Sequence, residues 1–327
     1  MKTQINHFDA SGNAFLQIES GSLDDFSLGD SVDIIIGKKT LRNIPYHSGL
    51  YCKMFDTVLV HVNEKIYFAI RHGNAMREYG LHIGEEIFIR LNKRKYYWEK
   101  ENAYSFEEKE DRTQYADEES FANFRPLFDG KLAFYRSSSP FDDAYHRAFS
   151  VQQCVEKYGI KTIINMADTE DDFAKIFGAL NDESRDILNM CDIYPIGDDS
   201  GLYSHEFEES ILKAMRIVID AKTPCLIHCR AGKRRSGFVC AILQALYGMD
   251  DYEITADYMV SYKNNNGVTY EDNPARYDYL RDDTIKKILI HINGKNLDNL
   301  FNTTKSYLAR IGLTDLEIST LIAKLYQ

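Results

Sequence analysis

The sequence lacks any run of about 20 apolar residues, the length that a membrane-spanning helix requires. Its first residues also lack the apolar core of a secretory signal, although a leader removed by processing would leave no trace. No two of the 6 cysteines form a Cys-x-x-Cys pair, and their spacings do not suit zinc. Scattered single thiols favour a reducing compartment, so we expect a cytoplasmic protein.

A net positive charge is also absent from the sequence. The formal net charge is −11 over 327 residues, which argues against broad binding to nucleic acid or to anionic membranes. The hydrophobic fraction of 44% is enough for a sizeable core, and the length suits two domains. Against this acidic background one group of basic residues stands out: Arg230, Lys233, Arg234 and Arg235.

The basic group lies within a pattern that predicts a strand, a tight turn and a helix. Residues 225–227 are apolar, as in a buried strand, and apolar residues recur at helical spacing from Phe238 to Leu246. In such an arrangement backbone N–H groups and the positive end of the helix dipole meet at the turn and create an anion site. Cys229 stands at the start of this turn, where amides and cations should favour its thiolate form.

Arg235 follows Cys229 at the predicted start of the helix. Its planar guanidinium can hold two phosphate oxygens at once, and a thiolate that faces a bound phosphate can attack phosphorus. His228-Cys229, five residues and then Arg235-Ser236 resembles the signature of the cysteine-dependent protein tyrosine and dual-specificity phosphatases. The alternative is a structural cysteine in the core beside a run of basic residues at the surface. The strand and helix around the motif disfavour this alternative.

The resemblance implies a phosphomonoesterase that forms a phosphocysteine on Cys229 and needs no metal or other cofactor. It also implies that His228 orients the turn and activates the thiol, and that Ser236 stabilises the departing thiolate. The residues that would bind phosphate are those of the turn: Arg230, Ala231, Gly232, Lys233, Arg234 and Arg235.

The proton donor for the leaving oxygen is less well defined. In the resembled family it is an Asp on a loop roughly thirty residues before the cysteine, where a raised pKa would suit the role. Asp198 and Asp199 fall in that window, directly after a predicted strand at residues 193–196. The loop lacks the Trp-Pro-Asp form of the tyrosine phosphatases, so the choice stays open. We favour Asp199, then Asp198, against the alternative of a solvated acidic turn.

The first part of the chain reads as β-structure. Runs of β-branched and aromatic residues at 32–36, 57–62, 66–70 and 87–91 are separated by turn residues, including a hairpin turn at 63–65. Residues 27–34 resemble residues 82–89, since an apolar residue, Gly and an acidic residue precede a strand in both. This repeat predicts a small closed barrel or a pseudo-symmetric sheet, and we expect a small, barrel-like N-terminal domain.

The second part reads as an α/β domain with a mainly parallel central sheet flanked by helices. A helix that ends at Gly159 is followed by an apolar strand, and the strand–turn–helix at Cys229 continues the alternation. The polar residues 107–120 have no apolar period and read as a linker, so we expect domains at 1–118 and 119–327. The run around Arg136 and its following serines resembles bacterial phosphatases of this superfamily, and would either border the pocket or form a plain strand end.

Several assignments of substrate and partner remain open from the sequence. A protein tyrosine or dual-specificity phosphatase comes first, and the basic turn makes a phosphoinositide or inositol-phosphate phosphatase the second choice. A phosphate-binding module without catalysis is the rival, which the presence of both Cys229 and Arg235 disfavours. The N-terminal domain would bind a partner or substrate, or cover the active site.

Overall fold

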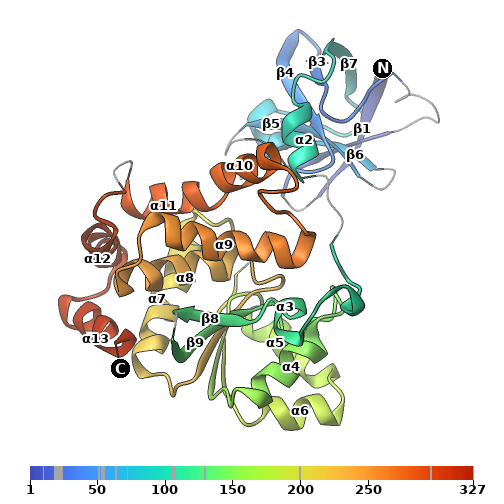
Figure 1. The fold of residues 1–327 in the computed structure, drawn as a ribbon. Helices are drawn as coiled ribbons and strands as arrows, with labels where there is room; N and C mark the ends of the chain where they lie inside the picture. Colours follow the sequence, from blue (N-terminus) through green and yellow to red (C-terminus); the bar gives the residue numbers. More distant parts are fainter. Residues whose placement is uncertain are drawn as a thin grey trace. The chain divides into compact units, whose positions relative to one another are not determined.

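The chain folds into two compact units of different architecture (Figure 1). The computed structural model describes residues 1–9, 11–17, 25–50, 52, 56–62, 65–71, 73–104, 108–128, 130–198, 200–294 and 297–326. The units span Met1–Phe106 and Glu107–Gln327. The prediction of an α/β chain with a barrel-like first part and a separate second sheet is confirmed. Among the described residues, no helix is long and apolar enough to cross a membrane.

The first unit is a closed barrel whose described strands follow the order β1-β2-β6-β5-β4-β3-β7. Two short helices, α1 (Ala75–Tyr79) and α2 (Trp98–Tyr104), accompany it. The strands are β1 (Lys2–Phe8), β2 (Ala14–Leu16), β3 (Ser31–Ile36), β4 (Lys39–His47), β5 (Thr57–Val62), β6 (Lys65–Ile70) and β7 (Glu86–Lys93).

The two copies of the sequence repeat are neighbours in this barrel. They contain β3 and β7, which pair antiparallel with Ile34 opposite Ile89. Gly29 and Gly84 precede the strands with φ of 88° and 84°, a conformation that side chains with a Cβ rarely adopt. The predicted hairpin joins β5 and β6, which pair antiparallel; its residues 63 and 64 lie outside the described part of the chain.

The second unit contains a sheet with strand order β11-β10-β12-β9-β8. β10 pairs parallel with β11 and with β12, and β12 pairs parallel with β9. Within the described part of this sheet only the β8–β9 pair is antiparallel. The strands are β8 (Arg125–Phe128), β9 (Lys131–Ser137), β10 (Thr162–Asn165), β11 (Asp192–Pro195) and β12 (Cys225–His228).

Helices surround this sheet, and one of them is buried along most of its length. α4 and α6 share a hydrophobic core with β10 and β12, whereas α8 contacts β12 and β8 and packs against α11, α12 and α13. The residues of α8 from Ser236 to Leu246 are all buried. The helical elements are η1 (Arg112–Gln114), α3 (Glu118–Phe121), α4 (Ala148–Lys157), α5 (Glu170–Ala179), α6 (Asp182–Leu188), α7 (His205–Asp220), α8 (Arg234–Tyr247), α9 (Asp251–Asn266), α10 (Pro274–Asp283), α11 (Ile285–Asn293), α12 (Leu300–Ile311) and α13 (Asp315–Leu325).

The segment expected to be a solvated linker packs against the second unit instead. Lys109 N donates to Asn265 O at 2.7 Å, and the buried Arg147 side chain donates to the carbonyl groups of Lys109 and Phe121. Consequently the division by contacts falls after Phe106, earlier than the expected boundary between residues 118 and 119. The contacts are polar and involve the backbone, which is why an apolar period does not reveal them.

Each unit should unfold as a separate transition. Phe68 in β6 and Phe134 in β9 are both fully buried, and Phe→Ala in a core costs about 3–5 kcal/mol. In calorimetry, Phe68→Ala should lower the melting temperature of one transition and Phe134→Ala that of the other. If both variants shift a single shared transition, the two units do not unfold independently.

Candidate active site

Cys229 lies directly after β12, in the loop that connects this strand to α8. β12 has parallel neighbours on both sides, β10 and β9, so the loop leaves the carboxyl edge of the sheet, where ligands bind in sheets of this kind. Cys229 is 6% exposed, and its Sγ lies 3.3 Å from Ser236 Oγ in the first turn of α8. The structure therefore brings the predicted nucleophile and the predicted hydroxyl into contact.

Three carbonyl groups of the loop are bonded to donors outside it. A peptide plane directs its C=O and N–H groups in opposite directions, so the outward carbonyls of Arg230 and Gly232 turn the N–H groups of Ala231 and Lys233 the other way, whereas Gly232 N donates to Cys229 O at 3.4 Å within the loop. This is the arrangement that an oxyanion site requires. The principal contacts are Ser139 N to Arg230 O at 3.0 Å, Asn265 Nδ2 to Ala231 O at 3.1 Å and Arg136 Nη2 to Gly232 O at 3.0 Å.

Gly232 is required by its surroundings as well as by its backbone conformation. Its φ of +65° disfavours other residues, and a Cβ there would lie 2.3 Å from Ser137 O and 2.7 Å from Asn123 Nδ2. The close approach of β9 to the loop therefore depends on the absence of a side chain.

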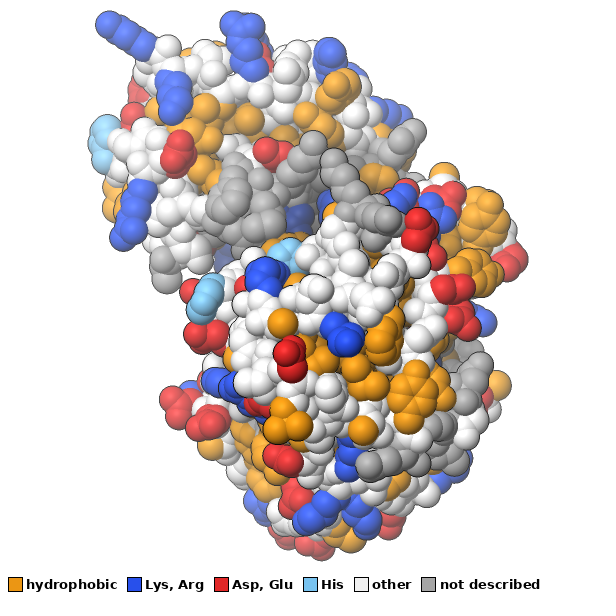
Figure 2. Space-filling view, turned by 90° about the vertical axis from the view of Figure 1, so that its left-hand side faces the viewer, with side chains coloured by type: hydrophobic (Ala, Val, Ile, Leu, Met, Phe, Trp, Pro, Cys, Tyr) orange, Lys and Arg blue, Asp and Glu red, His pale blue; other side chains and the backbone are white. Residues whose placement is uncertain are grey.

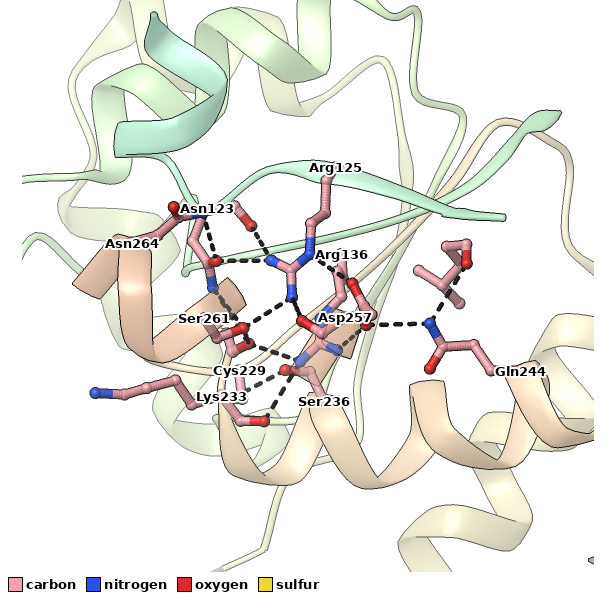
Figure 3. A network of polar contacts seen from close by, with 12 residues as sticks. Asn123, Arg125, Arg136, Cys229, Lys233, Ser236, Gln244, Asp257, Ser261 and Asn264 are labelled. Atoms are coloured by element: carbon pink, nitrogen blue, oxygen red, sulfur yellow. Dashed lines mark hydrogen bonds and ion pairs between the residues drawn. The ribbon is translucent and has the colours of Figure 1, made fainter. Parts of the chain in front are cut away.

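An ion cluster behind the loop holds these donors in place (Figure 3). Asp257 on α9 accepts from Arg125 Nε at 2.6 Å, from Arg136 Nη1 at 2.7 Å and from Gln244 Nε2 at 3.0 Å. Burial alone would raise the pKa of Asp257, but the two guanidinium groups lower it to about 2. The side chain of Arg136 is fully buried in this cluster, so it supports the loop from behind.

Asn123 links the ion cluster to the loop, and the sequence analysis missed it. Its Nδ2 lies 3.3 Å from both Ala231 O and Gly232 O, and its Oδ1 accepts from Arg125 Nη1 at 2.7 Å. Its φ of 52° places it in the left-handed region that Asn tolerates better than most residues. It precedes β8, far from Cys229 in the sequence, so no local motif marks it.

The polar residues of α9 could have been found from their spacing. Asp257, Ser261 and Asn265 recur every four residues, which places them on one face of the helix. Ser261 Oγ lies 3.2 Å from Gly232 O and 2.9 Å from Arg125 Nη2. Polar residues on the face of a helix that packs inward indicate a buried polar partner, here the phosphate loop.

His228 is a neutral residue in this site. It is fully buried beside Phe141, with ring centroids 5.3 Å apart. Burial lowers the pKa of His228 to about 3, against an opposing contribution from the Cys229 backbone. A neutral ring adds no positive charge to the thiolate, so its role in orienting the loop stays a prediction.

The Arg235 guanidinium is held by the loops that follow β10 and β11. Its Nη2 donates to Ser200 O at 2.8 Å and its Nη1 lies 3.4 Å from Met166 O. Asp198 Oδ1 lies 3.7 Å from Arg235 Nη2. The predicted phosphate-binding arginine is thus oriented in part by Asp198 and Ser200, which lie in the loop that was predicted to carry the acid.

Asp198 is engaged as a hydrogen-bond acceptor. Its Oδ1 accepts from Ser200 N at 2.7 Å, and its Oδ2 accepts from Ser210 Oγ at 2.9 Å. Together with the ion pair to Arg235, these contacts favour a positioning role for Asp198. Asp199, the favoured acid, lies outside the described residues.

A third carboxyl group, Asp168, lies near the loop and was not considered from the sequence. It follows β10, whose last residue Asn165 is the register partner of His228. Asp168 is 6% exposed, and burial raises its pKa, although Asn165 Nδ2 donates to its Oδ2 at 2.9 Å. The signal in the sequence is an Asp just beyond the carboxyl end of a predicted parallel strand.

Two further basic side chains of the loop, those of Arg230 and Lys233, have acidic neighbours. Arg230 Nε lies 2.7 Å from Asp142 Oδ2, and Lys233 Nζ lies 2.8 Å from Glu108 Oε1. On the face drawn in Figure 2, Lys and Arg side chains are likewise interspersed with Asp and Glu. Within the described part of the chain, no cluster of three or more His, Cys, Asp or Glu side chains could hold a metal ion.

The sequence model of the tyrosine phosphatase family matches residues 133–327, more than half of the chain. The chain belongs to the tyrosine phosphatase family. The match covers Cys229, Arg235 and most of the supporting residues of this phosphatase, and it confirms the resemblance drawn from the signature. No curated protein sequence matches the chain.

Solved structures also resemble parts of this phosphatase. The catalytic core of the PP-IP phosphatase Siw14 from S. cerevisiae is 22% identical, with 54% of this chain and 95% of that chain covered and a TM-score of 0.31. TpbA from P. aeruginosa, solved in complex with pTyr, is 15% identical. The match covers 62% of this chain and 98% of that chain, with a TM-score of 0.32. A conserved protein from Thermotoga maritima is 17% identical, with 27% and 34% covered and a TM-score of 0.24.

The Asp257 cluster should make stability depend on pH in a defined direction. Its folded-state pKa of about 2 lies below the ordinary value of about 3.9, so its stabilising effect is complete above that value and is lost as the pH falls toward 2. Asp257→Asn leaves two buried guanidinium groups without their counter-charge and should cost about 3–5 kcal/mol at pH 7.

Urea unfolding of both proteins at a series of pH values checks this expectation. The difference in unfolding free energy between wild type and Asp257→Asn should shrink from pH 5 to pH 3. A difference that stays constant over this range would show that Asp257 titrates normally.

Proposed function

We propose that this phosphatase hydrolyses phosphotyrosine in proteins through a phosphocysteine formed on Cys229. The observation that carries the proposal is the loop itself, in which outward-bonded carbonyl groups leave amides around a thiol 3.3 Å from Ser236 Oγ. Such a cradle stabilises the equatorial oxygens of a transferring phosphoryl group. The presence of thiol and cradle together disfavours a module that only binds phosphate.

The reaction would proceed in two steps. The Cys229 thiolate attacks phosphorus, the bond to the leaving oxygen breaks, and a carboxylic acid gives that oxygen its proton. Water then attacks the phosphocysteine, the same carboxylate takes a proton from it, and inorganic phosphate and the Cys229 thiolate are released. Ser236, in contact with Sγ, would stabilise the thiolate as it departs.

The pairing of the basic side chains favours phosphotyrosine as substrate. The phosphoinositide alternative depended on unpaired positive charges around the loop, but Lys233 and Arg230 both have carboxylate partners. A phosphoserine or phosphothreonine substrate, as in a dual-specificity enzyme, remains within the same chemistry. Recognition of a partner or substrate by the N-terminal barrel, and a cytoplasmic location, remain predictions from the sequence.

The cysteine mechanism is tested with an aryl phosphate in the presence of a chelator. Wild type should release phosphate, whereas Cys229→Ser should lose activity by at least about a thousandfold, because a serine hydroxyl at neutral pH is a far weaker nucleophile than a thiolate. Comparable turnover by both proteins, or loss of wild-type turnover on chelation, would eliminate this mechanism.

The general acid can be identified from pH profiles. If Asp168 is the acid, kcat/KM of wild type should fall as the pH rises through its raised pKa, because the acid is active only when protonated. Asp168→Asn should then lower kcat by about a hundredfold and abolish this alkaline limb.

Asp199→Asn and Asp198→Asn are compared with Asp168→Asn in the same experiment. Loss of the alkaline limb in Asp199→Asn instead would restore the choice made from the sequence. Asp198→Asn should mainly raise KM, since Asp198 supports the arginine that would bind phosphate.

A further inference from the structure

Two ion pairs at the loop differ in their exposure to solvent. In the pair between Lys233 and Glu108 the side chains are 11% and 20% exposed. In the pair between Arg230 and Asp142 they are 62% and 22% exposed. Exposed pairs are screened by water and salt and contribute little, so the pair that affects the field at the site is the one with Glu108.

Lys233 is held on several sides. Besides the contact with Glu108, its Nζ donates to Asn266 Oδ1 at 2.9 Å and lies 5.4 Å from the centre of the Tyr262 ring. Burial lowers the pKa of Lys233, while the negative charges of Glu108 and of the Cys229 thiolate oppose this effect. The ammonium group thus lies within electrostatic range of both the carboxylate and the nucleophile.

Among the described residues, one of the two carboxylate oxygens of Glu108 makes no hydrogen bond. Its Oε2 is buried and has no hydrogen-bond partner within the described part of the chain. Tyr145 lies in the same region: burial raises its pKa most, Glu108 raises it next, and smaller contributions come from Arg230, which lowers it, and from Asp142 and Cys229, which raise it. A carboxylate and the nucleophilic sulfur therefore act on one small region.

We propose that Glu108 is a specificity-determining residue that restricts this site to substrates with an isolated phosphate. The inference depends on the proposed phosphatase function. A second phosphate beside the reacting one would draw on the basic residues of the loop as counter-charges, but Glu108 already pairs with Lys233, the most buried of the paired basic residues, and so reduces the positive charge available to the additional anion. The net positive charge near a bound substrate is therefore smaller than the number of basic residues in the loop suggests.

Two peptides that differ by one phosphate test the proposal. One carries a single phosphotyrosine, and the other has the same sequence with a second phosphotyrosine next to the first. In wild type, kcat/KM for the doubly phosphorylated peptide should be lower. Glu108→Gln keeps the shape but removes the charge, and should raise the ratio of kcat/KM for the doubly over the singly phosphorylated peptide about tenfold.

Matched variants separate this effect from general damage. Asp142→Asn removes the exposed acid and should change the ratio by less than about twofold, while Glu108→Asp keeps the charge and should retain most of the discrimination. A ratio unchanged in Glu108→Gln, or an equal rise in Asp142→Asn, would overturn the proposal. Absence of activity on the singly phosphorylated peptide in wild type would instead count against the proposed function itself.

If Glu108→Gln does not fold, a variant with the opposite expected effect on the kcat/KM ratio can be used. Asn266→Asp adds a second carboxylate beside Lys233 and should lower the same ratio. Competitive inhibition by inorganic phosphate and by pyrophosphate gives an independent readout, since Asn266→Asp should weaken inhibition by pyrophosphate more than by phosphate. Equal weakening of both would show that the carboxylates near Lys233 do not discriminate by charge.

Discussion

The outward hydrogen bonding of the carbonyl groups between Cys229 and Arg235 is the constraint on which the site depends. A loop of this length could present its carbonyls or its amides to a ligand, and only the second choice attracts an anion. Donors on β9 and α9 make that choice, and Asp257 holds the guanidinium donors between them. The charge that binds phosphate is thus arranged by a carboxylate behind the loop.

The core of the site could be predicted because its signal is local. Strand, turn and helix at Cys229 follow one another in the sequence, and the chemistry requires that order. The repeat in the first part was informative for a similar reason, since each copy carries its own glycine, acid and strand. The structure then places the two copies side by side as β3 and β7.

The remaining parts could not be predicted because they depend on contacts between distant segments. Asn123 and Glu108 contact the loop from two separate places, Asp168 follows the neighbouring strand β10, and none of the three lies in a motif. The linker prediction was misleading for a further reason: polar segments are usually solvated, whereas polar groups among residues 108–120 form contacts with the rest of the second unit. The charge that the loop presents could not be predicted for the same reason, because the acids that pair with Lys233 and Arg230 lie elsewhere in the chain.

The burial of α8 has a consequence for how this enzyme can fail. The helix that begins at the phosphate loop is also the centre of its unit, with residues from Ser236 to Leu246 all inside. A surface loop can unfold locally while the rest of a protein stays folded, but the phosphate loop is continuous with a buried helix and should not unfold separately from it. Heat should therefore disrupt the phosphate loop itself only when the core of the unit comes apart.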